Sequence, residues 1–296
     1  MMRLIRVVGF WLLVSIVPAM AATETVFTYR APESERDTRY QYDTAVLKLA
    51  LEKTVSKYGA FRLQASPPMN FARAISALQQ NTYPNFFIKL SYEDELVHAG
   101  KATYAKFPVD LGIVGYRVCF ANEDSKRRVA NAKSLDDLRK LTMGQGQGWA
   151  DVTILRSNGF QVVEVSAYES LFRMVALGRF DLLCRGTNEL LEELESHKDI
   201  AGLTYDEAIS IAYPLPRFFF THAANQQAAE RIEEGLLLAY KDGSLQKEWI
   251  KNYRRSIDFV RLEKRRIFWI DNPLLKNLNF NYRQYFFDPL SERSTK

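Results

Sequence analysis

Strand-like runs alternate with helical patterns along this chain, and this alternation limits the fold more than any other feature of the sequence. Residues 25–29 and 61–65 have the β-branched and aromatic composition of strands, and apolar residues between 42 and 58 recur at helical spacing. Strands separated by helices predict a parallel sheet with helices on its faces. The same order returns later, with strands expected at 141–143, 160–165 and 180–184. Two such sets in 296 residues fit two α/β domains.

The first 21 residues have the pattern of a secretory signal peptide. Arg3 and Arg6 precede an apolar run at 7–17, and residues 19–21 form a small-x-small cleavage pattern. The run is too short to span a bilayer in the ordinary way, although an uncleaved anchor remains the alternative. Cleavage after Ala21 would lower the formal net charge from +5 to +3. We therefore expect a periplasmic mature chain that does not span the membrane.

The two cysteines, Cys119 and Cys184, both lie in apolar, strand-like runs. In an oxidising compartment two thiols can pair, but the sequence does not give the distance between them. A free cysteine is also a common buried residue. We expect buried free thiols, with a disulfide as the alternative.

Sequence motifs of enzymes and metal sites do not occur in the chain. The three histidines are isolated from one another, and there is neither a Cys-x-x-Cys pair nor a Gly-x-Ser-x-Gly elbow. We expect no catalytic residues, no metal and no cofactor. A catalytic site assembled from distant residues remains an alternative, because the members of a triad need not be adjacent in sequence.

A glycine-rich turn at 144–149 is the most specific local signal for binding. It follows an expected strand and precedes an expected helix, where unpaired backbone N–H groups attract a carboxylate or phosphate. Trp149 stands where the dinucleotide-binding fingerprint needs its third glycine, so that motif is excluded. A tight turn that needs positive φ is the alternative interpretation. Gln145, Gln147 and Trp149 are the ligand-binding candidates here.

Arginines at expected strand ends are further candidates. Arg30 and Arg185 directly follow strands, and ligands of open parallel sheets bind beyond the carboxyl ends of the strands. Glu33 lies in the charged loop after Arg30, and Arg117 interrupts an apolar run, where it must find a partner or a cleft. Arginine forks match carboxylates well. Internal salt bridges and a solvated loop are the alternatives.

A basic run at 261–266 precedes three apolar residues at 267–269 and opens an aromatic-rich, irregular tail. Basic and aromatic side chains together are typical of nucleic-acid sites. An exported chain rarely meets nucleic acid, so we expect a solvated charged face and no nucleic-acid partner.

The order of segments between 134 and 253 resembles the periplasmic solute-binding proteins of the polar amino-acid type, a family 3-like group with the type II periplasmic binding fold. Residues 134–138 correspond to that family's SLDDL segment, and residues 178–181 to its GR-x-D turn. Residues 241–244 and 249–250 match its closing pair of helices. The resemblance covers residues 24–255 and indicates a divergent branch.

The resemblance implies a two-lobe α/β fold with two crossovers, near 115–121 and 204–212, and a ligand between lobes that close by hinge motion. Residues 145–149 match the family's anion-holding turn, and Arg117 lies near its carboxylate-clamping arginine. Gly186, preceded by Arg185, replaces the aspartate that holds an amino group. The implied domains are a signal peptide (1–21), lobe 1 (22–117 and 210–257), lobe 2 (118–209) and a C-terminal extension (258–296).

These observations predict a periplasmic solute-binding protein, not an enzyme, for a small amino-acid-like or acidic solute, with an anionic one favoured. An inner-membrane transporter or sensor is the expected partner. One alternative is an accessory module with a degenerate ligand site that binds a protein through its tail. An exported enzyme is the other.

Overall fold

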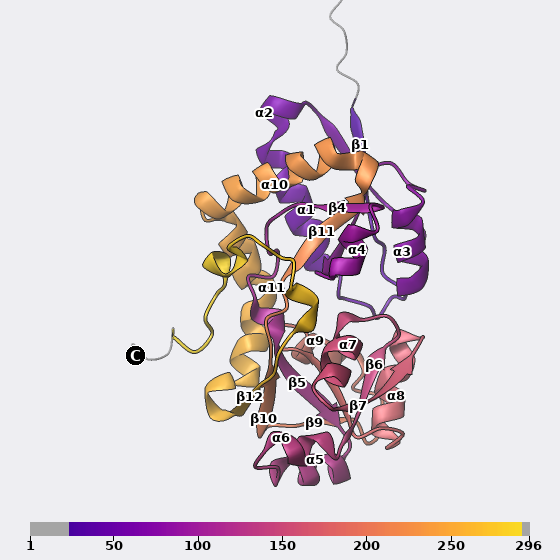
Figure 1. Ribbon diagram of the computed structural model, residues 1–296, viewed down its shortest axis with the longest axis vertical. Coiled ribbons are helices and arrows are strands. Elements are labelled where there is room, and N and C mark those ends of the chain that lie inside the picture. The colour runs from indigo at the N-terminus through magenta and orange to yellow at the C-terminus, as the bar shows by residue number, and fades with distance from the viewer. Residues whose placement is uncertain (1–23, 292–296) are drawn as a thin grey trace, which may run out of the picture.

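The computed structural model describes residues 24–291, so the expected signal peptide lies outside the described part. Two β-sheets, each with its own helices, form two lobes stacked along the long axis (Figure 1). No helix within residues 24–291 has the length and hydropathy needed to cross a membrane. The two-lobe α/β fold expected from the sequence is confirmed.

The first lobe is built on a five-stranded sheet of order β2-β1-β3-β11-β4. β1 is parallel to β2 and β3, whereas β11 is antiparallel to β3 and β4. The strands are β1 (Thr25–Tyr29), β2 (Phe61–Ala65), β3 (Phe86–Ser91), β4 (Ala102–Tyr104) and β11 (Arg217–His222). The helices are α1 (Gln41–Lys53), α2 (Val55–Tyr58), α3 (Phe71–Gln79), α4 (Asp94–His98), α10 (Gln226–Lys241) and α11 (Ser244–Val260), with short 3-10 helices at Ile113–Gly115 and Ala223–Asn225.

The second lobe is built on a seven-stranded sheet of order β12-β10-β5-β8-β6-β7, with β9 paired to β5. The strands are β5 (Tyr116–Ala121), β6 (Thr142–Gly146), β7 (Gln161–Val165), β8 (Leu182–Gly186), β9 (Thr204–Tyr205), β10 (Ile209–Ala212) and β12 (Arg266–Trp269). The helices are α5 (Glu123–Ala130), α6 (Leu135–Arg139), α7 (Ala150–Ser157), α8 (Tyr168–Ala176) and α9 (Leu190–Ser196). The chain enters this sheet at β5 and leaves it after β10, so the expected lobe boundaries at 117 and 210 fall inside these two strands.

Helices α1 and α10 pack unusually closely in the first lobe. A Cβ atom at Gly235 of α10 would lie 2.0 Å from the carbonyl oxygen of Ala50 on α1. Around this contact lie buried side chains from both helices and from α11, including Leu47, Leu236 and Trp249. The absent side chain thus lets α10 cover α1 and complete the core of this lobe.

The C-terminal segment is part of both lobes. β12 pairs in parallel with β10, and the chain then runs from the lower lobe toward the upper one, in yellow in Figure 1. There the backbone N–H of Phe287 donates to the carbonyl of Leu111 at 2.8 Å, and Tyr282 and Phe286 pack against the core of the first lobe. Most of the tail aromatics that a docking surface would need are therefore partly or fully covered, although Trp269 is 57% exposed. The 3-10 helices of this segment are Leu262–Lys264, Pro273–Leu275 and Tyr282–Tyr285.

The expectation of free thiols is wrong, because Cys119 and Cys184 form a disulfide. β5 and β8 are antiparallel, and their register places the two cysteines directly opposite each other. Side chains in directly opposed positions on antiparallel strands are neighbours. The sequence pattern does not contain the register of two strands that are far apart in the chain. It therefore could not show that the two cysteines face each other.

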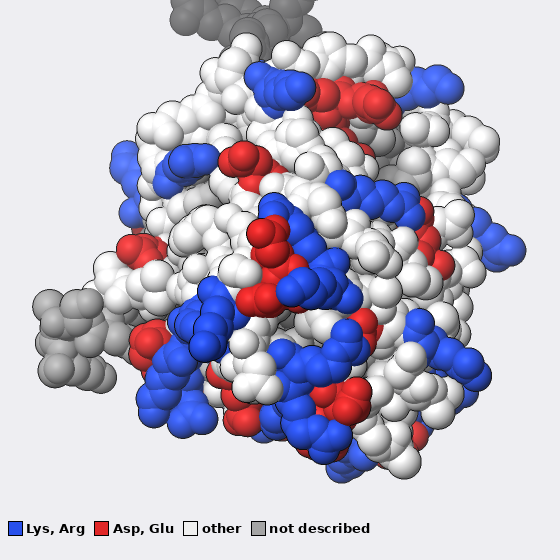
Figure 2. Space-filling model, turned by 60° about the horizontal axis from the view of Figure 1, so that its bottom comes forward, with Lys and Arg blue, Asp and Glu red and all other residues white. Residues whose placement is uncertain are grey.

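Basic residues gather on the end of the second lobe with acidic residues between them (Figure 2). Arg128 pairs with Asp181, Lys126 with Glu207, and Arg255 with Glu195. In the basic run itself, Arg265 is buried and donates to backbone carbonyls, whereas Arg261, Lys264 and Arg266 are exposed. This face carries mixed charge.

Helix α6 begins with the capping box that the sequence predicts. The Ser134 hydroxyl accepts from the N–H of Asp137, and the Asp137 carboxylate accepts from the N–H of Ser134, both at 3.2 Å. Ser134→Ala is expected to lower the free energy of unfolding by about 1 kcal/mol, because one helix N–H loses its acceptor. Urea denaturation measures the loss, and Ser134→Thr should keep most of the stability. Equal stability of the alanine variant and the wild type would contradict this role of the cap.

Candidate functional site

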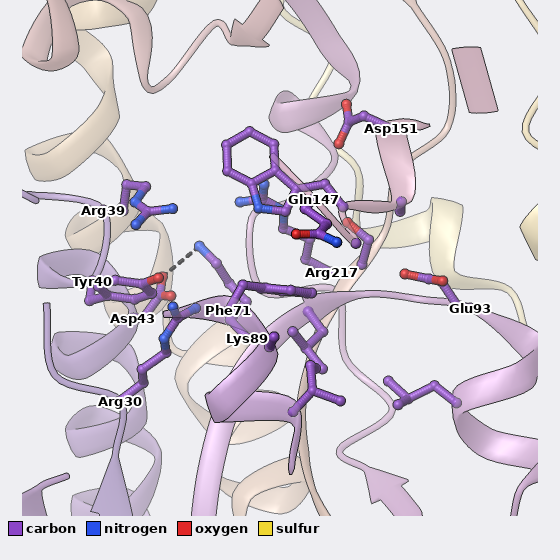
Figure 3. Close-up of a pocket in the computed structure, with 18 of the residues that line it drawn as sticks. Arg30, Arg39, Tyr40, Asp43, Phe71, Lys89, Glu93, Gln147, Asp151 and Arg217 are labelled. Atoms are coloured by element: carbon purple, nitrogen blue, oxygen red, sulfur yellow. Dashed lines mark ion pairs between the residues drawn. The ribbon is translucent and has the colours of Figure 1, made fainter. Parts of the chain in front are cut away.

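A cavity of about 630 Å³ lies between the lobes and takes its walls from both. The first lobe contributes the loop after β1, the start of α3 and the segment after β3; the second contributes the turn between β6 and α7 and the segment after β8. In Figure 3, Arg30, Arg39 and Tyr40 stand on one side of the cavity and Glu93 on the other, with Phe71 between them.

Four of the seven residues expected to bind a ligand line this cavity: Arg30, Gln147, Trp149 and Arg185. The other three, Glu33, Arg117 and Gln145, support its walls. Gln145 is buried, and its amide nitrogen donates to the carbonyl of Cys184 at 3.3 Å. The glycine-rich turn thus lines the cavity from Gln147 onward, whereas Gln145 lies behind it.

Arg30 holds the loop after β1 in place and is 6% exposed. Its guanidinium donates to Glu33 at 2.8 Å and to the carbonyl of Met69 at 3.1 Å, and it lies 4.8 Å from the centre of the Tyr40 ring. Its Nε is buried and has no hydrogen-bond partner within the described chain. Arg30 is thus a cavity-lining arginine whose hydrogen bonding is incomplete.

Arg117 lies behind the cavity wall in a buried ion pair with Asp151, the second residue of α7. Its Nε donates to Asp151 at 2.9 Å and to the hydroxyl of Tyr213 at 3.0 Å. Burial favours the neutral carboxylic acid, but Arg117 and Tyr213 outweigh it and hold the pKa of Asp151 below its ordinary value. This arginine is therefore occupied by a carboxylate of the protein.

Arg185 is held by two glutamates of the same lobe. Its Nε donates to both carboxylate oxygens of Glu193 at 2.9 Å, and its NH2 group lies 3.1 Å from Glu189. Burial opposes ionisation of Glu189, yet Arg185 and Arg217 hold the pKa of this carboxyl well below its usual range. The Arg185 guanidinium also lies 4.7 Å from the Trp149 ring, so it orients that ring at the cavity wall.

The sequence analysis missed several cavity residues, among them Tyr40, Asp43, Phe71, Lys89 and Glu93. Lys89 sits on β3 between Asp43 and Asp110, with 2.7 Å from its Nζ to Asp110, and burial raises the pKa of Asp43 to about 6. Glu93 is the second residue after β3, so the rule used for Arg30 and Arg185, which considers the residue directly after a strand, does not reach it.

Glu93 and Glu95 differ from the other acidic residues of the cavity, and Glu93 is the less exposed of the two. The Glu93 side chain forms neither a hydrogen bond nor an ion pair with any residue between 24 and 291. Burial, and then the charges of Glu95 and Asp151, raise the pKa of Glu93 to about 7. The cavity therefore has an uncompensated carboxyl group opposite its basic side.

The loop that follows β1 also joins the two lobes beside the cavity. Ser34 donates to Glu169 of α8 at 2.8 Å, and Arg36 pairs with Asp199 at 3.0 Å. The guanidinium of Arg39 lies 3.7 Å from the centre of the Tyr168 ring. These contacts close one side of the space between the lobes.

No cluster of three or more potential metal-ligating side chains occurs within residues 24–291. The cavity instead combines charged groups with three aromatic rings, from Tyr40, Phe71 and Trp149. Such a lining suits reversible binding of a small polar molecule.

No protein-family model and no curated protein matches the sequence. Solved structures do match the fold. An ancestral arginine-binding protein bound to arginine is 17% identical, with a TM-score of 0.57, over 77% of this chain and 98% of its own. A substrate-binding protein of an amino acid ABC transporter from Streptococcus pneumoniae, bound to L-arginine, is 12% identical, with a TM-score of 0.56, over 78% and 94%.

A histidine kinase sensor domain with similarity to periplasmic binding proteins is 15% identical, with a TM-score of 0.55, over 78% of this chain and 95% of its own. At these identities the similarity shows the fold alone. The chain has the two-lobe type II periplasmic binding fold, and the resemblance found in the sequence is confirmed at that level.

Proposed function

We propose that this chain is an exported solute-binding protein that holds a small amino-acid-like solute between its lobes. The observation that carries the proposal is the cavity of about 630 Å³, which is large enough for an amino acid and is lined from both lobes. The similar structures are binding proteins and not enzymes, in agreement with a non-catalytic role. They include both transporter components and a sensor domain, and the proposed role is delivery to a transporter or a sensor.

The charges of the cavity refine the expected solute. Five basic and five acidic residues line it, so an acidic solute would meet as many carboxylates as cations. We propose that the solute carries one anionic group, held near Arg30 and Arg39 on the basic side of the cavity. The anionic character that the arginines predict then applies to one end of the solute and not to the whole molecule.

The proposal includes closure of the lobes around the solute by a hinge motion. Opening of the lobes would separate the contacts of Ser34 and Arg36 with the second lobe. Both contacts involve exposed or half-buried side chains, which cost little to separate.

A thermal-shift screen of the twenty amino acids and of C4 and C5 dicarboxylates tests this function. A solute present at 100 times its Kd adds about 2.7 kcal/mol to the free energy of unfolding and raises Tm. Arg30→Gln is expected to reduce the shift, whereas Arg173→Gln, an exposed change on α8, serves as the matched control. If no compound raises Tm, or if Arg30→Gln leaves every shift unchanged, the proposed site is wrong.

A further inference from the structure

We infer that Glu93 selects a solute with a cationic group, an ammonium or guanidinium, at the end opposite its carboxylate. This inference rests on the proposed function and names the class of solute for the same cavity. It departs from the simple expectation of an anionic solute.

The first argument is the contrast between Glu93 and the other buried or half-buried carboxylates of the cavity. Asp43 is paired with Lys89, Asp151 with Arg117, and Glu189 with Arg185 and Arg217. Glu93 has no such partner within the described residues, although its side chain is only partly exposed. A half-buried carboxylate without a counter-charge is unfavourable unless a ligand supplies the positive charge.

The second argument is the position of Glu93 in the cavity. It stands across the cavity from Arg30 and Arg39, and Asp151 lies on its own side (Figure 3). Burial and the charges of Glu95 and Asp151 disfavour the ionisation of Glu93 and raise its pKa. A cation beside Glu93 would favour the ionised form of this carboxyl group and would be held by it.

The third argument is the surface between the two charged sides. Phe71 lies between Arg30 and Glu93, and Trp149 faces the same cavity from the other lobe. Aromatic rings provide apolar contact for a carbon chain and also attract cations. The cavity therefore fits a molecule with a carboxylate, an aliphatic stem and a distal cationic group.

The test compares L-arginine, L-glutamine and L-glutamate by isothermal titration calorimetry at pH 8. We expect the wild type to bind arginine at least about tenfold more tightly than glutamate. Glu93→Gln is expected to weaken arginine binding by at least about 30-fold and to change glutamine binding by less than about threefold. Glu95→Gln is the matched control, because Glu95 is exposed and lines the same wall; it should change arginine affinity by less than about threefold.

A pH series of arginine affinities distinguishes the effect of the Glu93 charge from the effect of its side-chain shape. Because burial and the neighbouring carboxylates raise the pKa of Glu93 to about 7, the wild type should bind arginine about tenfold more weakly at pH 6 than at pH 8. Glu93→Gln should show a flatter profile, with a remainder from Asp43, whose pKa is about 6. Asp151 and Glu95 also face this group, and Arg117 keeps Asp151 ionised throughout the series.

The outcomes distinguish the two proposals. Preference for glutamate, or arginine binding that Glu93→Gln leaves unchanged, would overturn the role of Glu93 and leave the solute-binding function standing. If none of the three amino acids binds to the wild type, the amino-acid-like solute and the role of Glu93 both fail.

Discussion

Arg117→Met is expected to lower the free energy of unfolding by about 3–5 kcal/mol, the usual effect of removing one partner of a buried ion pair. Arg117 is 1% exposed and Asp151 is 3% exposed. The substitution leaves the Asp151 carboxylate buried beside Tyr213 without its arginine partner, and Glu189 loses one of its three arginine neighbours, 3.7 Å away. Urea denaturation at pH 7 measures the loss.

A double-mutant cycle identifies the cause of that loss. Arg117→Met with Asp151→Asn should recover part of the stability, because no unpaired carboxylate is then left in the interior. The deficit of the single variant should also shrink between pH 7 and pH 4: without Arg117, burial raises the pKa of Asp151, and its protonated form needs no counter-charge.

The control for the Arg117 variant is Arg127→Met, which removes an exposed pair with Asp124 and should change stability by less than about 0.5 kcal/mol. A loss of under 1 kcal/mol for Arg117→Met would contradict the buried ion pair.

Local patterns predicted the elements that surround the cavity. The expected helix at 42–58 is α1 followed by α2, and the expected strands at 25–29 and 61–65 are β1 and β2 with the same bounds. The turn at 144–149 does join a strand to a helix, since β6 ends at Gly146 and α7 begins at Ala150. These features depend on periodicity and turn residues within a few positions, which the sequence displays directly.

Contacts between distant segments could not be predicted in the same way. Arg117 and Asp151 are 34 residues apart in sequence and meet only in the folded protein, and Arg266 joins the sheet because β12 lies beside β10. Arg185 is a partial exception: Glu189 and Glu193 follow it at four and eight residues, so the sequence contained a hint that this arginine is neutralised from its own lobe. An arginine at a strand end is therefore a ligand candidate only after the acidic residues near it have been considered.

The disulfide between Cys119 and Cys184 is expected to contribute about 4 kcal/mol to stability. The cysteines are 65 residues apart, and in the chain-entropy model a loop of that length greatly restricts the unfolded chain. The loop contains β6, α7, β7 and α8, which carry the second-lobe wall of the cavity from Gln147 to Asp151. The double variant Cys119→Ala with Cys184→Ala should lose this stabilisation, and denaturant unfolding measures it.

The reduced wild type is the matched control for the double cysteine variant, because it also lacks the disulfide. The wild type with excess dithiothreitol should unfold near the denaturant midpoint of the double variant, whereas the double variant itself should not respond to reductant. The alanine changes also remove two buried sulfur atoms, so the double variant should be slightly less stable than the reduced wild type. If oxidised wild type and double variant instead unfold at the same midpoint, the cysteines do not constrain the unfolded chain, and the free thiols expected from the sequence are the better description. A lower denaturant midpoint for the reduced than for the oxidised wild type would show that the disulfide stabilises the second lobe and the cavity wall that this lobe carries. Such a bond persists in an oxidising compartment.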